Sequence, residues 1–304
     1  MLSACLVVSS IFGHAAGESL GVVYPELREP YNKVFDTIIG GIEYAARAKI
    51  DKYSLEKFND SATLESNIKG NGNRVVLALG ANSRKLMHGL KLDIPVVFGA
   101  ILPSSEDFGQ SDSTGISLLP DPSMLFEKLV SFAPGIQIVS VVYNPEHNQS
   151  LIKDAAESAR RIGLLLDTRT ATDIHSSAKI FKELAESVDG RTNAIWLLPD
   201  RITIDSDAIL PYLLEEAWNR HFIVFSSKLD HAKRGALFSM YPDNFKMGRD
   251  LGKLAIQIEA NPAPTGISGL RALKTAVNIR TAKHLGIDLL SRNDDSFDLV
   301  FPMQ

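Results

Sequence analysis

The residues best placed to do chemistry in this chain follow short apolar runs. Gly80-Ala81-Asn82-Ser83 ends one such run and leads into a helix-like segment. A helix that begins there would direct free backbone N–H groups and the positive end of its dipole beyond the strand. We therefore predict that these four residues, including the Ser83 hydroxyl, hold the carboxylate of a small ligand. The alternative is that Asn82 or Ser83 only caps the helix, and the two roles are compatible.

Two later apolar runs end in polar side chains in the same way. Tyr143 and Asn144 follow one of them, and Asp200 follows the other. The Asn144 amide can donate to and accept from a zwitterion or a hydroxyl group, and the Asp200 carboxylate can hold a ligand ammonium group. Each has a plainer alternative, because Asn-Pro often starts a turn and Asp200 could pair with Arg201 or start the next helix. We predict that Tyr143, Asn144 and Asp200 contact a ligand.

Five further residues complete the predicted ligand-binding set. Tyr24 ends the first apolar run, and a flat ligand ring could stack on it. Gly99, Ala100 and Ser226 are small residues at strand ends, where they would let a ligand approach the backbone. Tyr241 starts the segment after the last of these apolar runs, and we expect it to line a hinge.

Motifs that would indicate catalysis are missing from the sequence. The seven histidines form no His-Glu-x-x-His pattern and no cluster of metal ligands. There is no P-loop, no Gly-x-Ser-x-Gly and no Gly-x-Gly-x-x-Gly after the first strand. Ser-x-x-Lys occurs three times at unrelated positions, which shows how readily this short pattern arises. We expect no enzymatic activity, no cofactor and no metal.

Composition limits the class of protein and of partner. The 304 residues, 45% of them hydrophobic and 22% charged, are ordinary for a globular protein of about two domains. The net charge of -4 is small and the charges are interspersed, so nothing attracts the chain to nucleic acid or to an anionic membrane. We expect a monomer whose partner is a small solute or another protein.

Residues 1–16 are interpreted as an export signal. Met1 to Phe12 is an apolar stretch too short to span a bilayer, and small residues follow it near Ala15 and Ala16, where a signal peptidase would cut. The positively charged start of such signals is absent, which leaves open a true start further upstream. In that case Leu2-Ser3-Ala4-Cys5 fits a lipoprotein cleavage site, and Cys5, the only cysteine, would carry the lipid. Either way we expect a periplasmic protein.

Strand and helix patterns alternate along the chain and predict an α/β fold with two doubly wound, parallel-sheet lobes. Predicted strands at 20–24, 52–58, 75–79 and 94–100 alternate with helical patterns. The pattern dissolves from Ile101 to Leu119 and restarts at Asp121-Pro122, a typical helix start. We therefore predict one lobe from 19–118 plus 241–263 and another from 119–240 plus 264–304. Lobes joined by several strands are expected to hinge around a cleft.

Several short segments, taken in order, resemble the ABC-transporter substrate-binding protein family whose better-known members bind tryptophan or tyrosine. The resemblance spans roughly residues 20 to 290, and the segments are VLALG (76–80), IPVVF (94–98), TGIS (114–117), YNP (143–145), LPD (198–200), GAL (235–237) and NIRTAKHLG (278–286). Each segment alone is common in α/β proteins, so their order and spacing carry the specificity.

The resemblance implies a type I periplasmic binding fold, two lobes that close on a small solute, no enzymatic activity, and delivery to a membrane permease with its ATPase. One departure bears on the ligand. Members of the family often have an Asp-Pro pair after the Phe-containing strand, where this chain has Gly99-Ala100-Ile101-Leu102. The solute could therefore be an amino acid, an aromatic solute or another small molecule. Two alternatives remain: closed lobes that report to a membrane sensor protein, and an enzyme that uses the same cleft.

Overall fold

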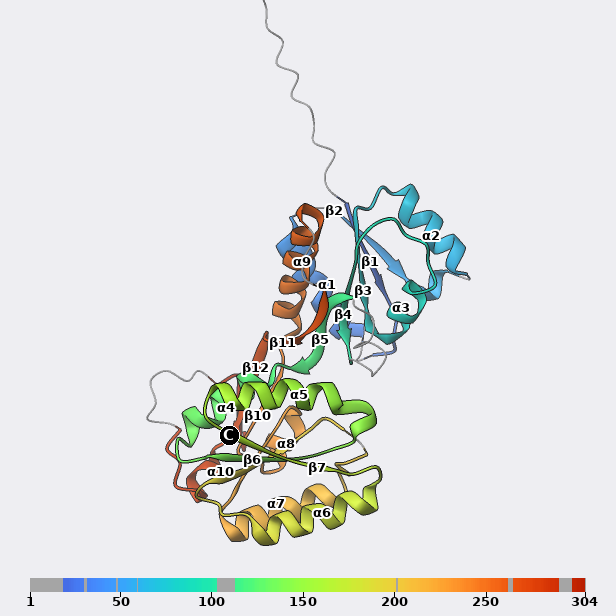
Figure 1. The fold of residues 1–304 in the computed structure, drawn as a ribbon. Coiled ribbons are helices and arrows are strands. Elements are labelled where there is room, and N and C mark those ends of the chain that lie inside the picture. Colours follow the sequence, from blue (N-terminus) through green and yellow to red (C-terminus); the bar gives the residue numbers. More distant parts are fainter. Residues whose placement is uncertain are drawn as a thin grey trace, which may run out of the picture.

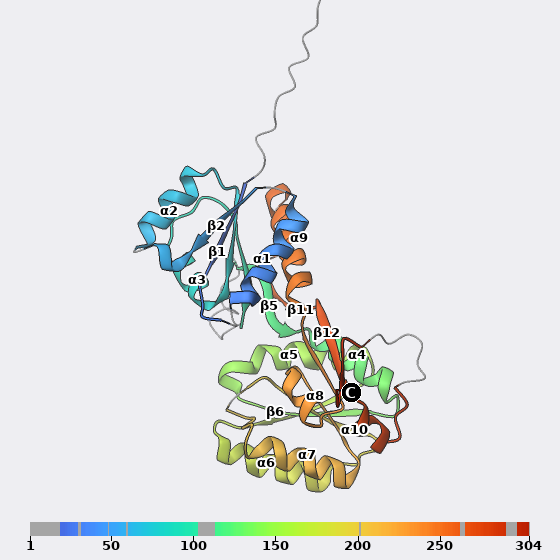
Figure 2. The ribbon, with the colours of Figure 1, turned by 180° about the vertical axis from the view of Figure 1, so that it is seen from behind.

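The computed structural model describes residues 19–29, 32–47, 49–58, 60–102, 113–200, 202–261, 265–289 and 297–303. The expected export signal, Cys5 and Arg201 lie outside these ranges. Two α/β units stand one above the other, and connecting segments join them along one side (Figures 1 and 2). Among the described helices, none has both the length and the apolar character that crossing a membrane requires.

The upper unit in Figure 1 is built on a six-stranded sheet in which all described pairings are parallel. Its middle strands are buried because helices cover both faces. One face packs against α1 (Asn32–Ala46) and α9 (Asn244–Ala260), and the other against α2 (Ser61–Gly70) and α3 (Gly80–Met87). The strand order is β11 (Gly266–Leu270), β5 (Thr114–Pro120), β4 (Val96–Ile101), β3 (Val75–Leu79), β1 (Ser19–Tyr24), β2 (Lys49–Ser54).

The lower unit has a seven-stranded sheet, parallel except where β10 meets β12. The strand order is β13 (Leu299–Phe301), β12 (Leu273–Asn278), β10 (Phe238–Pro242), β9 (Ile223–Ser226), β8 (Asn193–Leu197), β6 (Ile138–Tyr143), β7 (Leu165–Thr170). One buried core joins the sheet to α4 (Pro122–Phe132), α5 (Pro145–Arg161) and α10 (Ile279–His284). Another joins it to α6 (Ile174–Ser187) and α7 (Ile209–Arg220), and α8 (Leu229–Arg234) packs on β10 and β12.

The predicted α/β fold with two largely parallel sheets is confirmed. Buried apolar runs became strands because helices cover both faces of each sheet, and α4 begins as predicted. The Asp121 carboxylate accepts a hydrogen bond from the Ser123 backbone N–H, and Pro122 follows at the first helical position.

The segment 101–119, in which no strand was predicted, contains strand β5 from Thr114 onward. β5 alternates buried and half-buried residues and contains Gly115 and Pro120, so it lacks the apolar run that marks the inner strands. Its outer neighbour β11, a Gly- and Ser-containing strand, was also not predicted, and it pairs with β5 rather than with the second sheet. The division of the chain into 19–118 plus 241–263 and 119–240 plus 264–304 stays a prediction about domains.

The chain passes between the two sheets three times. The first passage follows β5, the second follows β10 and leads into α9, and the third joins β11 to β12. Hydrogen bonds link these segments side by side: the Asp121 N–H donates to the Leu270 carbonyl at 2.9 Å, and the Asp243 N–H donates to the Ala272 carbonyl at 2.9 Å. The three segments therefore form one laterally bonded hinge.

Candidate functional site

The strands of the first sheet bring three predicted segments to one edge. Val23 pairs with Ala78 and Leu79 pairs with Gly99, so the strand ends at Tyr24, Gly80 and Ala100 are neighbours. These carboxyl ends point toward the lower unit in Figure 1. In open α/β sheets this edge is where ligands bind.

Helix α3 begins at this edge without a side-chain cap. Gly80 is its first residue and has a φ of 81°, a conformation that favours glycine, and the preceding Leu79 offers no capping atom. Asn82 is exposed, and the capping role considered for Asn82 or Ser83 is absent. Ser83 is fully buried, and among the described residues its Oγ has no hydrogen-bond partner. The helix start thus keeps backbone donors and one hydroxyl available.

The fold itself accounts for features of Gly99 and Ala100, without any ligand. A Cβ on Gly99 would lie 2.5 Å from Leu251 Cδ1, so this glycine lets α9 pack against the sheet. Ala100 has a φ of 54°, and the pairing of β4 with β5 shifts register around it. The prediction that a ligand approaches the backbone here stays a prediction, and packing already accounts for the glycine.

The second sheet gathers the other predicted segments at its carboxyl edge. Val141 pairs with Trp196 and Leu197 pairs with Ser226, which aligns the ends of β6, β8 and β9. Asn144 is buried and caps α5, with its Oδ1 accepting from the Glu146 N–H at 2.9 Å.

Asp200 links two of these strand ends. Its Oδ1 accepts from the Ile202 N–H at 2.8 Å, a local bond to the segment that follows β8. Its Oδ2 accepts from Asn148 Nδ2 at 3.0 Å. Sequence reasoning did not identify Asn148, whose only signal was its position one turn into α5. A carboxylate has about four lone-pair sites, so Asp200 can still accept from a ligand.

The hydroxyl groups of Ser226 and Tyr143 already have hydrogen-bond partners within the protein. Ser226 is fully buried, contacts His231 Nδ1 at 2.8 Å and the Leu197 carbonyl at 3.2 Å, and accepts from the Lys228 N–H at 3.1 Å. Tyr143 is almost buried in the core, and its hydroxyl donates to Gln149 Oε1 at 3.2 Å. Ligand contact at either residue stays a prediction, and for Ser226 the hydroxyl has little capacity left.

The other two predicted tyrosines, Tyr24 and Tyr241, are half-buried. Burial, with a smaller effect of Glu26, raises the pKa of Tyr24. Burial and the carboxylates of Asp298 and Asp243 raise the pKa of Tyr241. Both phenols are therefore neutral hydrogen-bond groups at neutral pH. Tyr241 lies two residues before Asp243, at the second passage between the lobes, where we expected a hinge residue.

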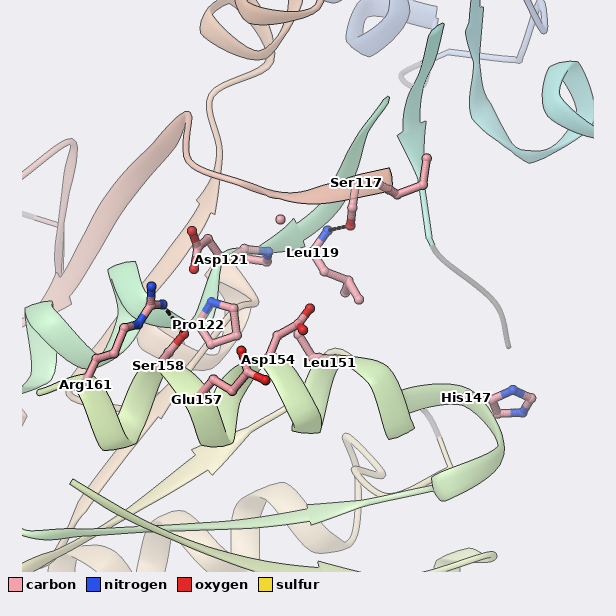
Figure 3. A pocket seen from close by; sticks show the side chains of 13 residues that line it. Ser117, Leu119, Asp121, Pro122, His147, Leu151, Asp154, Glu157, Ser158 and Arg161 are labelled. Carbon is pink, nitrogen blue, oxygen red and sulfur yellow. Dashed lines mark hydrogen bonds between the residues drawn. The ribbon is translucent and has the colours of Figure 1, made fainter. Parts of the chain in front are cut away.

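A pocket of about 230 Å³ lies between β5 and β11 of the first unit and α5 of the second. Figure 3 shows α5 running beneath β5, with Asp154 and Glu157 on the helix side of the pocket. Burial, followed by the charge of Glu157, raises the pKa of Asp154. The lining includes Ser117, Leu119, Asp121, His147, Leu151, Asp154, Glu157, Ser158, Arg161, Ile267 and Gly269.

None of the predicted ligand-binding residues lines this pocket. Sequence reasoning placed candidates at strand ends, whereas this pocket is lined by one face of a helix and by strands at the hinge. The available signal was the spacing of His147, Leu151, Asp154, Ser158 and Arg161, which repeats with the period of a helix. No group of three or more potential metal ligands gathers in the described part of the chain.

The comparisons with known proteins agree with a two-lobed binding protein. The family described as "ABC transporter substrate binding protein" matches residues 39–293. The chain belongs to that family, and the resemblance seen in the sequence is confirmed. No curated protein matches the chain.

Solved structures share the fold at low sequence identity, and the predicted type I periplasmic binding fold is confirmed. A ligand-free, open substrate-binding protein with adhesive properties from Clostridium difficile is 18% identical, with 93% of this chain and 99% of that one covered and a TM-score of 0.65. An ABC domain in complex with L-Trp from Streptococcus pneumonia is 19% identical, with 94% and 100% covered and a TM-score of 0.53. A conserved domain protein from Vibrio cholerae is 18% identical, with 93% and 99% covered and a TM-score of 0.52.

Proposed function

We propose that this protein captures a small solute between its two lobes and presents the closed form to an ABC permease. The observation that carries the proposal is a pair of strand edges, by which we mean the carboxyl ends of the parallel strands in each sheet. There is one such edge on each lobe, and a three-segment hinge joins the lobes. A ligand that contacts both edges binds more tightly when the lobes are closed, so it shifts the population toward the closed form. Binding alone is the activity, without catalysis or a cofactor.

The chemistry of the first edge suits a carboxylate. The uncapped start of α3 supplies backbone N–H donors and the positive end of a helix dipole, and the buried Ser83 hydroxyl adds one donor. The second edge offers the Asp200 carboxylate to an ammonium group. Tyr24 is placed to cover an apolar or aromatic part of the solute. An amino acid, including an aromatic one, satisfies all three.

The family assignment supports an exported protein, and we propose that it is a periplasmic monomer. The partner of the closed form is a permease, rather than nucleic acid, because the chain has a small net negative charge. A membrane sensor protein as the recipient is the rival role. The genes next to this one distinguish the two, since a permease and an ATPase accompany an importer.

The test is thermal unfolding of the chain from residue 17 with a panel of amino acids, aromatic acids, sugars and nucleobases. A ligand at about 100 times its dissociation constant adds about 2.7 kcal/mol to the free energy of unfolding. A shift with an amino acid supports the proposal. A shift with only another class of solute overturns the proposed ligand, and no shift with any solute argues against solute capture.

A further inference from the structure

Asp121 lies at the centre of the hinge and contacts both lobes. Its backbone N–H donates to the Leu270 carbonyl at the end of β11, in the first lobe. Its Oδ1 accepts from the Ser123 N–H and so caps α4, in the second lobe. A Cβ added to Gly269 would lie 2.8 Å from Asp121 Cα, which shows how closely β11 approaches this residue.

An ion pair at the surface of the hinge joins Arg271 to Asp121. Arg271, in the passage from β11 to β12, donates from Nη1 to Asp121 Oδ2 at 2.6 Å and lies 3.4 Å from Ser123 Oγ. The two partners are 150 positions apart in the sequence and belong to different passages between the lobes. The Arg271 side chain is 62% exposed and that of Asp121 is 22% exposed.

This pair is an ionic contact between two of the hinge segments. The second passage has an aspartate at the equivalent place, since Asp243 caps α9, but Asp243 pairs with Lys246 of its own helix. Rotation of one lobe against the other turns α4 and Ser123 relative to β11 and so changes the geometry around Arg271. The pair is therefore positioned to favour one relative orientation of the lobes.

We propose that the arrangement of lobes seen here is the open, ligand-free one, and that the Arg271–Asp121 ion pair is a latch that favours it over the closed form. Arg271 acts as a positioning residue, because it touches neither predicted edge. The inference rests on the proposed function in one respect: the closure that the latch opposes is the closure that accompanies solute binding. The latch itself is a property of the ligand-free protein and can be measured without any ligand.

The size of the effect expected on losing the ion pair follows from the partial exposure of its two side chains. Partly exposed ion pairs contribute up to about 1 kcal/mol, which corresponds to about a fivefold change in a two-state ratio. Loss of the pair is therefore expected to raise the ratio of closed to open molecules by a factor of about two to five. An effect of that size leaves the fold intact.

The test compares ligand-free variants by pulsed spin-label distance measurements. Labels on Ser66→Cys in α2 and Lys182→Cys in α6, in a Cys5→Ser background, report the distance between the lobes. Both label positions are exposed. Arg271→Gln removes the pair, and Asp121→Asn removes the charge but keeps an oxygen that can cap α4. Arg271→Lys keeps the charge, and Arg191→Gln breaks an exposed pair with Asp189 in the second lobe as a control.

We expect Arg271→Gln and Asp121→Asn to increase the short-distance population about two- to fivefold. Arg271→Lys should restore most of the original distribution, and Arg191→Gln should leave it unchanged. Identical distributions in all five proteins would overturn the proposal, and so would a longer distance in Arg271→Gln. Melting temperatures measured in parallel identify any variant that fails to fold. If Arg271→Gln fails to fold, the distances in Asp121→Asn decide whether the latch exists. A protein that binds no solute but shows the shift keeps the latch and loses the proposed function.

Discussion

Two serines at the strand edges have the same burial and opposite bonding. Ser83 and Ser226 are both fully buried, but Ser83 Oγ has no partner among the described residues, whereas Ser226 Oγ contacts three polar atoms. A buried hydroxyl without a partner costs stability unless something else satisfies it. The contrast shows that Ser226 is bonded within the fold, and it supports the proposal that Ser83 serves a ligand.

Ser83→Ala therefore tests the binding role. We expect no loss of stability in the ligand-free protein, or a small gain, because no hydrogen bond in the described structure is removed. The affinity for the solute found in the thermal panel should fall about tenfold, the equivalent of about 1.4 kcal/mol. Ser226→Ala is the matched control: it should lower the free energy of unfolding by about 1 to 3 kcal/mol without any ligand. Equal effects of the two changes on stability would contradict this assignment.

His231, the partner of Ser226, predicts how stability depends on pH. It is 1% exposed, and burial, with a smaller effect of Lys228, lowers its pKa from 6.5 to about 4. The unfolded chain therefore takes up a proton first as the pH falls. The free energy of unfolding should be highest above pH 6.5 and fall by about 3 kcal/mol down to pH 4, at about 1.36 kcal/mol per unit of pKa shift.

Urea unfolding at a series of pH values from 7 to 4 measures this loss. Other groups titrate in the same range, so the comparison is with His231→Asn, which keeps a polar atom near the position of Nδ1. The variant should be less stable at pH 7 and should lose less stability between pH 6.5 and 4. Parallel curves for the two proteins would show that His231 does not account for the pH dependence.

At the scale of elements, α1 and α9 pack closely against each other. Gly41 lies against the backbone of α9, where an added Cβ would overlap the Phe245 carbonyl oxygen and lie 2.9 Å from the Arg249 nitrogen. A Cβ on Gly248 would overlap the Ile38 carbonyl oxygen in turn. The two helices therefore approach each other through glycines. Because α9 begins at the hinge, this contact fixes the second passage to the first lobe.

Adjacent glycines in α1 give a matched test of that contact. Gly41→Ala should destabilise the protein by about 1 to 3 kcal/mol, because backbone atoms must move to make room. Gly40→Ala meets nothing within 4 Å and should stabilise it by about 0.5 to 1 kcal/mol through helix propensity. Thermal or urea unfolding measures both. A stable Gly41→Ala protein would mean that the helices can separate without loss.

The elements also show what the sequence could and could not predict. Strands buried on both faces, such as β3 and β6, carry continuous apolar runs, and the N-cap at Asp121 is a local signal, so both were predictable. β11 is the edge strand of its sheet and β5 lies next to it, and both are partly exposed, which removes the apolar run. Asn148 and the α5 face of the pocket were missed because their proximity to Asp200 and to β5 depends on tertiary packing.

At the scale of the whole molecule, the two strand edges and the hinge act as one system. The described elements of the two sheets approach each other closely where β5 meets β10, which is beside the hinge. In the proposed function, the two edges share a ligand only after closure. Apparent affinity is then the intrinsic affinity of the closed form multiplied by the fraction of molecules that are closed. Under this proposal, a hinge substitution that shifts the closed fraction changes ligand affinity without changing the site.

This coupling gives a quantitative prediction for Arg271→Gln. The variant is expected to raise the ratio of closed to open molecules about two- to fivefold, as estimated from about 1 kcal/mol. When the closed form is the minor one, the closed fraction rises by nearly the same factor, and the dissociation constant should fall by that factor. Calorimetric titration of wild type, Arg271→Gln and Arg271→Lys with the solute from the thermal panel measures the affinities, and the spin-label distances give the closed fractions. Ser83→Ala should show the reverse pattern, with weaker binding at an unchanged ligand-free distance. A change in closed fraction without a matching change in affinity would mean that closure and binding are separate events in this protein.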